Sequence, residues 1–242
     1  MHPLEDDDVV VHVEALLRNP PEAPRSLGEG TLWLREHKLD DRCASALALA
    51  LRRGDHTHLR CVSLAANEIS ARGMAAIAGA IAQDTLPLLE LLSLDSNFIG
   101  DDGMKALCRA FNHVPKLKAI ECQRCGVGAE GWKAFTAAAT GGALQSLESL
   151  YASENSLGDE GIKGFCDTLG AGGLPRLSNA HFRQCEIGDE GCLALADAIE
   201  AGHLDHVRQV QMALNTQTRD GFEVVTDVIK EYDKQRKLQV IF

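Results

Sequence analysis

Aromatic residues are scarce in this chain, at 5% of 242 residues. Hydrophobic residues nevertheless make up 45% of the sequence, so aliphatic side chains and alanine must fill the core. Long apolar runs are also missing, and none approaches the roughly 20 consecutive residues that a membrane-spanning helix needs. We therefore expect a globular protein of one or two domains that does not enter a membrane.

Positive charge is in deficit too, because 24 basic residues face 35 acidic ones and the formal net charge is −11. A chain of this charge repels phosphate backbones, which argues against a nucleic-acid partner.

The sequence carries no recognisable secretion signal. Its N-terminus is acidic at 5–8, where a signal peptide would be basic, and His12 and Glu14 interrupt the apolar run that follows. None of the seven asparagines begins an N-x-[ST] glycosylation sequon. Eight cysteines in such a chain are more typical of reduced thiols than of a disulfide framework. Together these features predict a cytoplasmic protein.

The dominant pattern is an eleven-residue unit, L-x-x-L-x-L-x-x-N-x-I, that recurs along most of the chain. It is clearest at 59–69 and 89–99, weaker copies begin at 117, 147, 177 and 207, and partial copies lie at 32–39 and 240–242. Its ninth positions are His37, Asn67, Asn97, Cys125, Asn155, Cys185 and Asn215. They are 30 residues apart except for one step of 28. We place that shortening in the loop 112–116, where it leaves the register intact.

Each unit continues into a glycine-rich, acidic turn and then into apolar residues three and four positions apart. The turn is almost a copy in four units, at G100-D-D-G, G128-A-E-G, G158-D-E-G and G188-D-E-G. Glycine permits a tight turn, and an Asp or Ser in it is expected to cap the helix that begins there. Each unit therefore predicts a short strand, a turn, a helix and a polar return loop.

Seven copies in register resemble the leucine-rich repeat of the ribonuclease-inhibitor type, over roughly residues 32–242. The resemblance implies an α/β solenoid in the shape of a horseshoe, with a parallel β-sheet on the concave side and helices on the convex side. We expect an N-terminal capping helix and Pro-rich linker over 1–28, the repeats over 29–217, and a C-terminal capping helix and final strand over 218–242. Within the first segment, the helix is predicted over 6–18, where it should cover the first strand.

Side chains alternate between the two faces of a strand, so repeat positions 1, 4, 6, 9 and 11 should point into the core and positions 3, 5, 7 and 8 should face the concave surface. Near the second unit this surface should be small and plain, with Cys61, Ser63 and Ala65. From the fourth unit it carries side chains of the kind that dominate binding energies. The predicted partner-binding residues are Trp33, Glu121, Arg124, Tyr151, Glu154, His181, Arg183 and Ile241.

Candidate catalytic and metal-binding residues are few. Cys122 and Cys125 form a C-x-x-C pair, but the register puts them at a core position and in the asparagine column, with no second ligand pair. His181 and Glu154 could form an acid–base couple, yet an open ridge offers no pocket that excludes water. No Walker loop, nucleophile elbow or H-E-x-x-H motif occurs. We therefore predict no catalytic residue, no metal site and no cofactor.

The sequence thus favours a non-enzymatic protein–protein interaction module with a protein partner on its concave face. We expect an adaptor or structural subunit of a larger cytoplasmic assembly, and the resemblance adds cytoskeletal and ciliary complexes as settings. The alternative is a regulator of an enzyme, such as a ribonuclease-inhibitor-like inhibitor or a GTPase activator. A second contact is expected at the C-terminal edge strand, because no charge within 238–242 protects it and Ile241 should be exposed.

Overall fold

The computed structural model describes residues 6–18, 21–24, 28–54, 56–232 and 238–242. In these ranges eight helices alternate with eight three-residue strands, and the short 3-10 helix η2 (Phe111–His113) follows α4. The strands are β1 (Thr31–Trp33), β2 (Cys61–Ser63), β3 (Leu91–Ser93), β4 (Ala119–Glu121), β5 (Ser149–Tyr151), β6 (Asn179–His181), β7 (Gln209–Gln211) and β8 (Gln239–Ile241). The helices are α1 (Asp6–Arg18), α2 (Asp41–Arg53), α3 (Ala71–Ile81), α4 (Gly100–Ala110), α5 (Ala129–Thr140), α6 (Gly158–Gly170), α7 (Asp189–Glu200) and α8 (Arg219–Tyr232).

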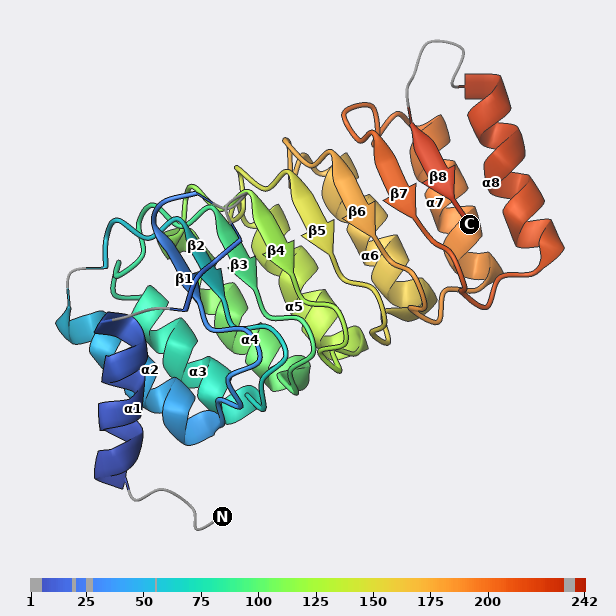
Figure 1. The fold of residues 1–242 in the computed structure, drawn as a ribbon. Coiled ribbons are helices and arrows are strands. Elements are labelled where there is room, and N and C mark those ends of the chain that lie inside the picture. The colour runs from blue at the N-terminus through green and yellow to red at the C-terminus, as the bar shows by residue number, and fades with distance from the viewer. Residues whose placement is uncertain (1–5, 19–20, 25–27, 55, 233–237) are drawn as a thin grey trace.

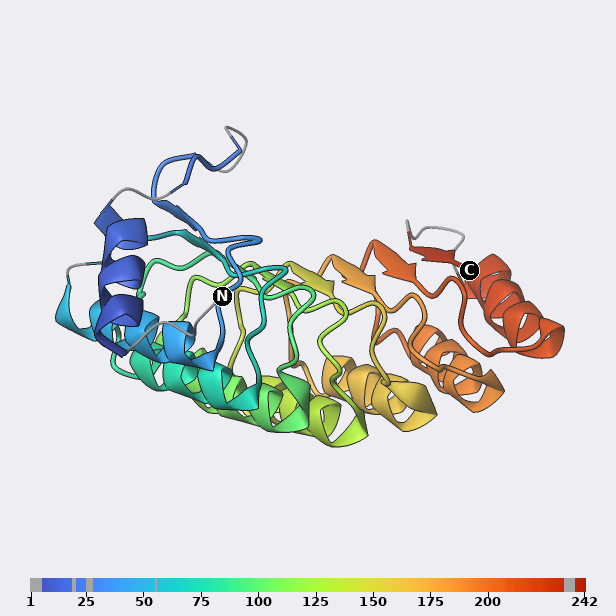
Figure 2. The same cartoon turned by 60° about the horizontal axis from the view of Figure 1, so that its bottom comes forward.

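The strands form one open parallel sheet in the order of the chain, β1 to β8. Figures 1 and 2 show two layers, in which the sheet forms one layer and the helices form the other, along one face of the sheet. The register is the predicted one, and it survives the two-residue shortening, because Ser93 pairs with Glu121 as Ser63 pairs with Ser93. The predicted solenoid is therefore confirmed, with its concave and convex layers.

The core follows the repeat positions that the sequence assigned to it. In the second unit Leu59, Val62, Leu64 and Ile69 are all at most 5% exposed, and the equivalent residues of the other central units are buried in the same continuous cluster. Each unit contributes one layer of aliphatic side chains between its strand and its helix. Adjacent layers stack, so a unit completes its core only against its neighbours.

The ninth position joins neighbouring units through side-chain hydrogen bonds to the backbone. In Asn155 the amide nitrogen donates to the carbonyls of Cys122 and Ala152, both at 2.8 Å. Its oxygen accepts from the backbone N–H groups of Cys125 and Val127 in the preceding unit, at 3.1 and 3.0 Å. A cysteine here, as at Cys125, donates through its thiol to the carbonyl of Leu94 in the preceding unit at 3.3 Å, and it has backbone hydrogen bonds with Ser96 and Asn97 of that unit. Asparagine at this position thus ties two turns of the solenoid together through both its amide nitrogen and its oxygen.

The helix starts bear out the capping prediction only in part, because Ser70 caps α3 by accepting from the backbone N–H of Arg72. Helices α4 to α7 have no side-chain cap of their own. Instead, Asp159 in the first turn of α6 accepts from the backbone N–H of Gly188, which starts the next helix, at 2.6 Å. Where alanine replaces this aspartate, as at Ala129, the next helix begins at a left-handed glycine, Gly158, with φ of 64°. Asp41, Asp101 and Asp189 hold the following helix start as Asp159 does.

The two ends of the solenoid differ in how well they follow the prediction. Helix α1 spans the expected residues and packs mainly against α2, whereas only its last turn approaches the first strand, where Leu17 lines a depression together with Thr31 and Leu32. Val9 and Val13 are its buried residues in that contact. At the other end, β8 joins the sheet as predicted, and the ring of Phe242 meets that of Phe222 in α8 at a centroid distance of 4.8 Å.

Candidate binding surface

The concave surface consists of three side-chain rows that run across the sheet. Row one holds repeat position 5, the last residue of each strand, in the register that the sequence predicted. Rows two and three hold positions 7 and 8, which follow each strand. Row one is Trp33, Ser63, Ser93, Glu121, Tyr151, His181, Gln211 and Ile241.

Row three has an unexpected backbone conformation. All seven of its residues have a left-handed φ, between 52° and 63°, and none of them is glycine. Leu214 is the extreme case, because this apolar side chain is 63% exposed. A left-handed φ is uncommon for residues other than glycine and costs on the order of 1 kcal/mol each. The sequence gives no glycine signal for this turn, and the prediction therefore missed it.

The concave surface is closed at the second unit and in row one of the third. Ser63, Ala65 and Ser93 are 1%, 0% and 3% exposed. In row one the two serines lie between the larger side chains of Trp33 and Glu121. The surface at the second unit is small and plain, as predicted, and its residues are in addition covered, so they offer a partner almost no area to contact. The hydroxyl of Ser63 has no hydrogen-bond partner within the described ranges.

Two partly buried carboxyl groups lie in the middle of the surface. Burial raises the pKa of the Glu121 carboxyl, and its hydrogen bond with Ser93 partly offsets that effect. Burial also raises the pKa of Asp95, which accepts from the backbone N–H of Gln123 at 2.7 Å and from its side-chain amide at 3.1 Å. These contacts direct both carboxyl groups toward neighbouring units, so Glu121 is less available to a partner than its register position suggested.

The C-terminal half presents an aromatic pair. The rings of Tyr151 and His181, on adjacent strands, meet edge to face with centroids 4.7 Å apart. Such pairs are favourable beyond the area that they bury. Burial lowers the pKa of His181, so its imidazole is neutral at pH 7. Both side chains are only partly buried, and they offer a fixed, amphipathic surface for contact.

Beside this pair lies a row of three charges. Glu154 accepts from Arg124 in a bidentate arrangement, at 2.6 and 2.9 Å, and lies 3.7 Å from the guanidinium of Arg183. The hydrogen bond from Arg124 lowers the pKa of the Glu154 carboxyl, which stays ionised. The suggested acid–base couple is absent from the contacts of the described residues, because Glu154 binds the two arginines while His181 contacts Tyr151.

We call Arg124, Tyr151, Glu154, His181 and Arg183 the C-terminal concave patch. The structure brings these five of the predicted binding residues together on β5, on β6 and in the turns that follow β4, β5 and β6. The other three are spread along row one. Trp33 is partly buried on β1, Glu121 lies between the two halves, and Ile241 is 37% exposed on β8.

The C-x-x-C cysteines lie in the core. Cys122 and Cys125 are both fully buried, and burial raises the pKa of Cys125 to about 12. All eight cysteines of the chain are free thiols. Among the residues that the structure describes, no three His, Cys, Asp or Glu side chains gather as metal ligands would.

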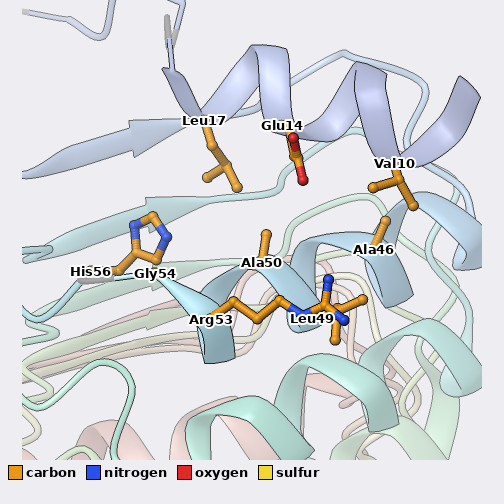
Figure 3. A pocket seen from close by; sticks show the side chains of 9 residues that line it. All are labelled: Val10, Glu14, Leu17, Ala46, Leu49, Ala50, Arg53, Gly54 and His56. Carbon is orange, nitrogen blue, oxygen red and sulfur yellow. The ribbon is translucent and has the colours of Figure 1, made fainter. Parts of the chain in front are cut away.

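A separate hollow of about 300 Å³ lies on the helical side, between α1 and α2 (Figure 3). Aliphatic side chains such as Val10, Leu17 and Leu49 line it, and the Glu14 carboxylate points from α1 toward α2. Its nine lining residues include no serine, threonine or cysteine nucleophile. The hollow has room for an aliphatic side chain, and it exists because α1 packs against α2, which the sequence did not predict.

Comparisons with known proteins identify the repeat. Residues 55–78, 85–108 and 181–196 match the family described as Leucine Rich repeat. Among solved structures, the chain is similar to "Leiomodin-1 Actin-Binding Site 2 (ABS2)", with 20% identity and a TM-score of 0.45 over 62% of this chain and 80% of that chain. It is also similar to an internalin from Listeria monocytogenes str. 4b F2365, with 14% identity and a TM-score of 0.47. That match covers 81% of this chain and 49% of the internalin. None of the helices in the described ranges combines the length and apolar character needed to traverse a bilayer.

Proposed function

Because this chain belongs to the leucine-rich-repeat proteins, we propose that it is a non-enzymatic binding module whose protein partner docks on the C-terminal concave patch. The observation that carries this proposal is the change in exposure along one surface. Row one is buried at Ser63 and Ser93, whereas Tyr151 and His181 reach solvent. A partner on the concave side therefore finds side chains to contact mainly on β5 and β6.

The chemistry of the patch suits protein recognition. Tyrosine and arginine are enriched among residues that dominate binding energies, and the patch holds Tyr151, Arg124 and Arg183. Their neighbours already fix them, Tyr151 through His181 and both arginines through Glu154. Fixed side chains lose less conformational entropy when a partner binds. Trp33, Glu121 and Ile241 complete the proposed site at its margins.

The patch favours an adaptor or structural subunit over an enzyme regulator. It mixes charges of both signs, whereas an inhibitor of a basic enzyme would gain most from a uniformly acidic surface. Eight free thiols suit a reducing compartment, and we propose a cytoplasmic assembly on that basis. Its placement in the cytoskeleton or cilium rests on the family resemblance alone.

We propose a second contact at β8, the outer strand of the described sheet. Its backbone pairs with β7 through bonds such as Met212 N–H to Ile241 O at 2.6 Å, and its other side can accept a further strand. Hydrogen exchange of residues 239–242 tests this contact. We expect protection to rise only in the assembled complex, and fast exchange in both states would rule the contact out.

Affinity purification from a native extract tests the main proposal. Wild type, Tyr151→Ala/Arg183→Ala and the convex-face control Lys133→Ala/Lys163→Ala serve as baits. We expect the concave double variant to lose the partner at least roughly thirtyfold in affinity, because truncating hot-spot residues costs about 2 kcal/mol or more. The control should retain it, and the melting temperatures of all three should agree closely.

The identity of the retained proteins separates the two functions. Stoichiometric recovery with several structural subunits supports an adaptor, whereas recovery with one enzyme or GTPase supports a regulator. Equal retention by wild type and the concave double variant would contradict the proposed site.

A further inference from the structure

A strip of basic side chains runs along the sheet edge where the return loops enter the strands, which is the upper edge in Figure 1. We call it the return-loop edge and define it by the residues just before and just after the first leucine position of units two to seven. Its backbone is continuous, since Glu90 N–H donates to Arg60 O at 2.7 Å and Lys118 N–H donates to Glu90 O at 2.8 Å. Side chains from successive strands therefore stand about 4.8 Å apart in one line.

The charge of this edge is opposite to that of the whole chain. Five cations lie on it, at Arg60, Lys116, Lys118, Arg176 and Arg208. Only two carboxylates, Glu90 and Glu148, accompany them, so the edge carries a net +3 on a chain of −11. Charges act mainly within a Debye length of about 8–10 Å, and a ligand at the edge therefore meets a positive surface.

The edge is also hollowed. A depression of about 420 Å³ is lined by Arg60, Leu88, Lys116, Lys118 and Arg176 around Glu90. Glu90 pairs with Arg60 and also with Lys118, whose ammonium lies 2.7 Å away. In the part of the chain that the structure describes, no ion pair is formed by Lys116 or Arg176. Lys116 and Arg176 are thus exposed cations that Glu90 does not neutralise, and they line the same depression as the partly exposed Leu88.

We propose that the return-loop edge is a second binding site, which takes an extended acidic segment of a partner protein. The four cations that line the depression are spread over four strand spacings, about 19 Å between Arg60 and Arg176, and do not converge on a single point. That length fits about six extended residues better than one small anion. Leu88, 36% exposed in the same depression, provides contact for an apolar side chain within the segment. This site is separate from the C-terminal concave patch.

Binding of a labelled peptide tests the proposal. The probe is the fluorescein-labelled hexapeptide EDLEDE, and the neutral analogue QNLQNQ is its control, measured by fluorescence anisotropy at low salt. We expect wild type to bind the acidic probe in preference to the neutral one. Lys116→Glu/Arg176→Glu should weaken this binding at least about tenfold, because it replaces two attractive contacts by repulsive ones. Tyr151→Ala/Arg183→Ala should leave it unchanged, which separates this site from the concave one.

A charge-matched variant makes the test specific. Lys133→Glu/Lys163→Glu alters net charge equally, but these exposed residues lie on α5 and α6. We expect it to bind the probe like wild type, with a similar melting temperature. Equal weakening in both charge-reversed variants would overturn the proposal, as would failure of wild type to bind EDLEDE. Tighter, edge-dependent binding of an oligothymidylate of equal charge would overturn it in favour of a nucleic-acid ligand.

Discussion

The two halves of the concave surface share a backbone and a register but offer opposite surfaces to a partner. Ser63 and Tyr151 occupy the same position in their strands, yet Ser63 is 1% exposed and Tyr151 is partly exposed. In the N-terminal half, small side chains lie between larger ones and are covered. In row one of the C-terminal half, the neighbouring residues Tyr151, His181 and Gln211 are all long and stand side by side. Register therefore decides which face a side chain is on, while the size of its neighbours decides whether a partner can reach it.

The largest expected effect comes from placing a long side chain at the closed second unit. Ser63→Arg should lower the free energy of unfolding by at least about 2 kcal/mol, because it overpacks a covered position and desolvates a charge. Gln211→Arg, at the same position of the seventh unit, should stay within about 0.5 kcal/mol of wild type. Urea unfolding of both variants measures the contrast. Equal destabilisation of the two would show that the halves do not differ.

A charge reversal within the C-terminal concave patch should have the next largest effect. Glu154→Lys removes the carboxylate shared by Arg124 and Arg183, so we expect a loss of about 1 kcal/mol that shrinks at high salt. Glu36→Lys is the matched change in row three of the N-terminal half, where Glu36 is exposed and pairs with its neighbour Arg35. It should cost less than about 0.5 kcal/mol. Thermal melts at two salt concentrations compare the two, and equal losses would contradict the described network.

Glu121, at the boundary between the halves, should make the stability of the folded state depend on pH. Burial raises the pKa of Glu121 above the ordinary value of 4.5, so ionisation of this group disfavours the folded state. The protonated carboxyl therefore contributes stability to the folded state. This contribution is fully present below the pKa of Glu121 in the unfolded chain and is lost as the pH rises through its pKa in the folded protein. Glu121→Gln should therefore be more stable than wild type at pH 7, by less than about 1 kcal/mol. The difference should vanish below pH 4.5. A difference that is independent of pH would refute this assignment.

The smallest effect concerns the unpaired hydroxyl of Ser63. Ser63→Ala removes a buried polar group without a partner in the described ranges, so stability should stay equal or rise by up to about 0.5 kcal/mol. Ser93→Ala removes a hydroxyl that bonds Glu121, and stability should fall. Reversed signs in unfolding experiments would show that the two serines have been assigned the wrong roles.

Much of the fold was predictable because it depends on periodicity. The repeat of 30 residues places Ser63 beside Ser93, and the shortened step still pairs Ser93 with Glu121, as predicted. The members of the C-terminal concave patch were likewise predicted as separate residues on one face. Their contacts were not, since the bidentate pairing of Arg124 with Glu154 depends on rotamers and on a left-handed turn that no glycine marks.

Other features depend on contacts between units, which one repeat viewed alone does not reveal. The aspartates of the G-D-x-G turns suggested caps for their own helices, whereas Asp159 holds the start of α7. The alternation of aspartate and alanine at this place, at 101, 129 and 159, was the available signal. No signal in the sequence indicated that α1 packs against α2, because the apolar face of α1 fits a helix as well as a strand.

The central claim is that a partner docks on the C-terminal half of the concave surface, and site-specific photo-cross-linking tests it most directly. A benzophenone amino acid replaces Gln211, beside His181 in row one, or Lys163 on the helical side of the same half. We expect the partner recovered by affinity purification to cross-link from position 211 and not from position 163. Cross-linking from 163 alone, with none from 211, would contradict the account and place the interface on the convex helices.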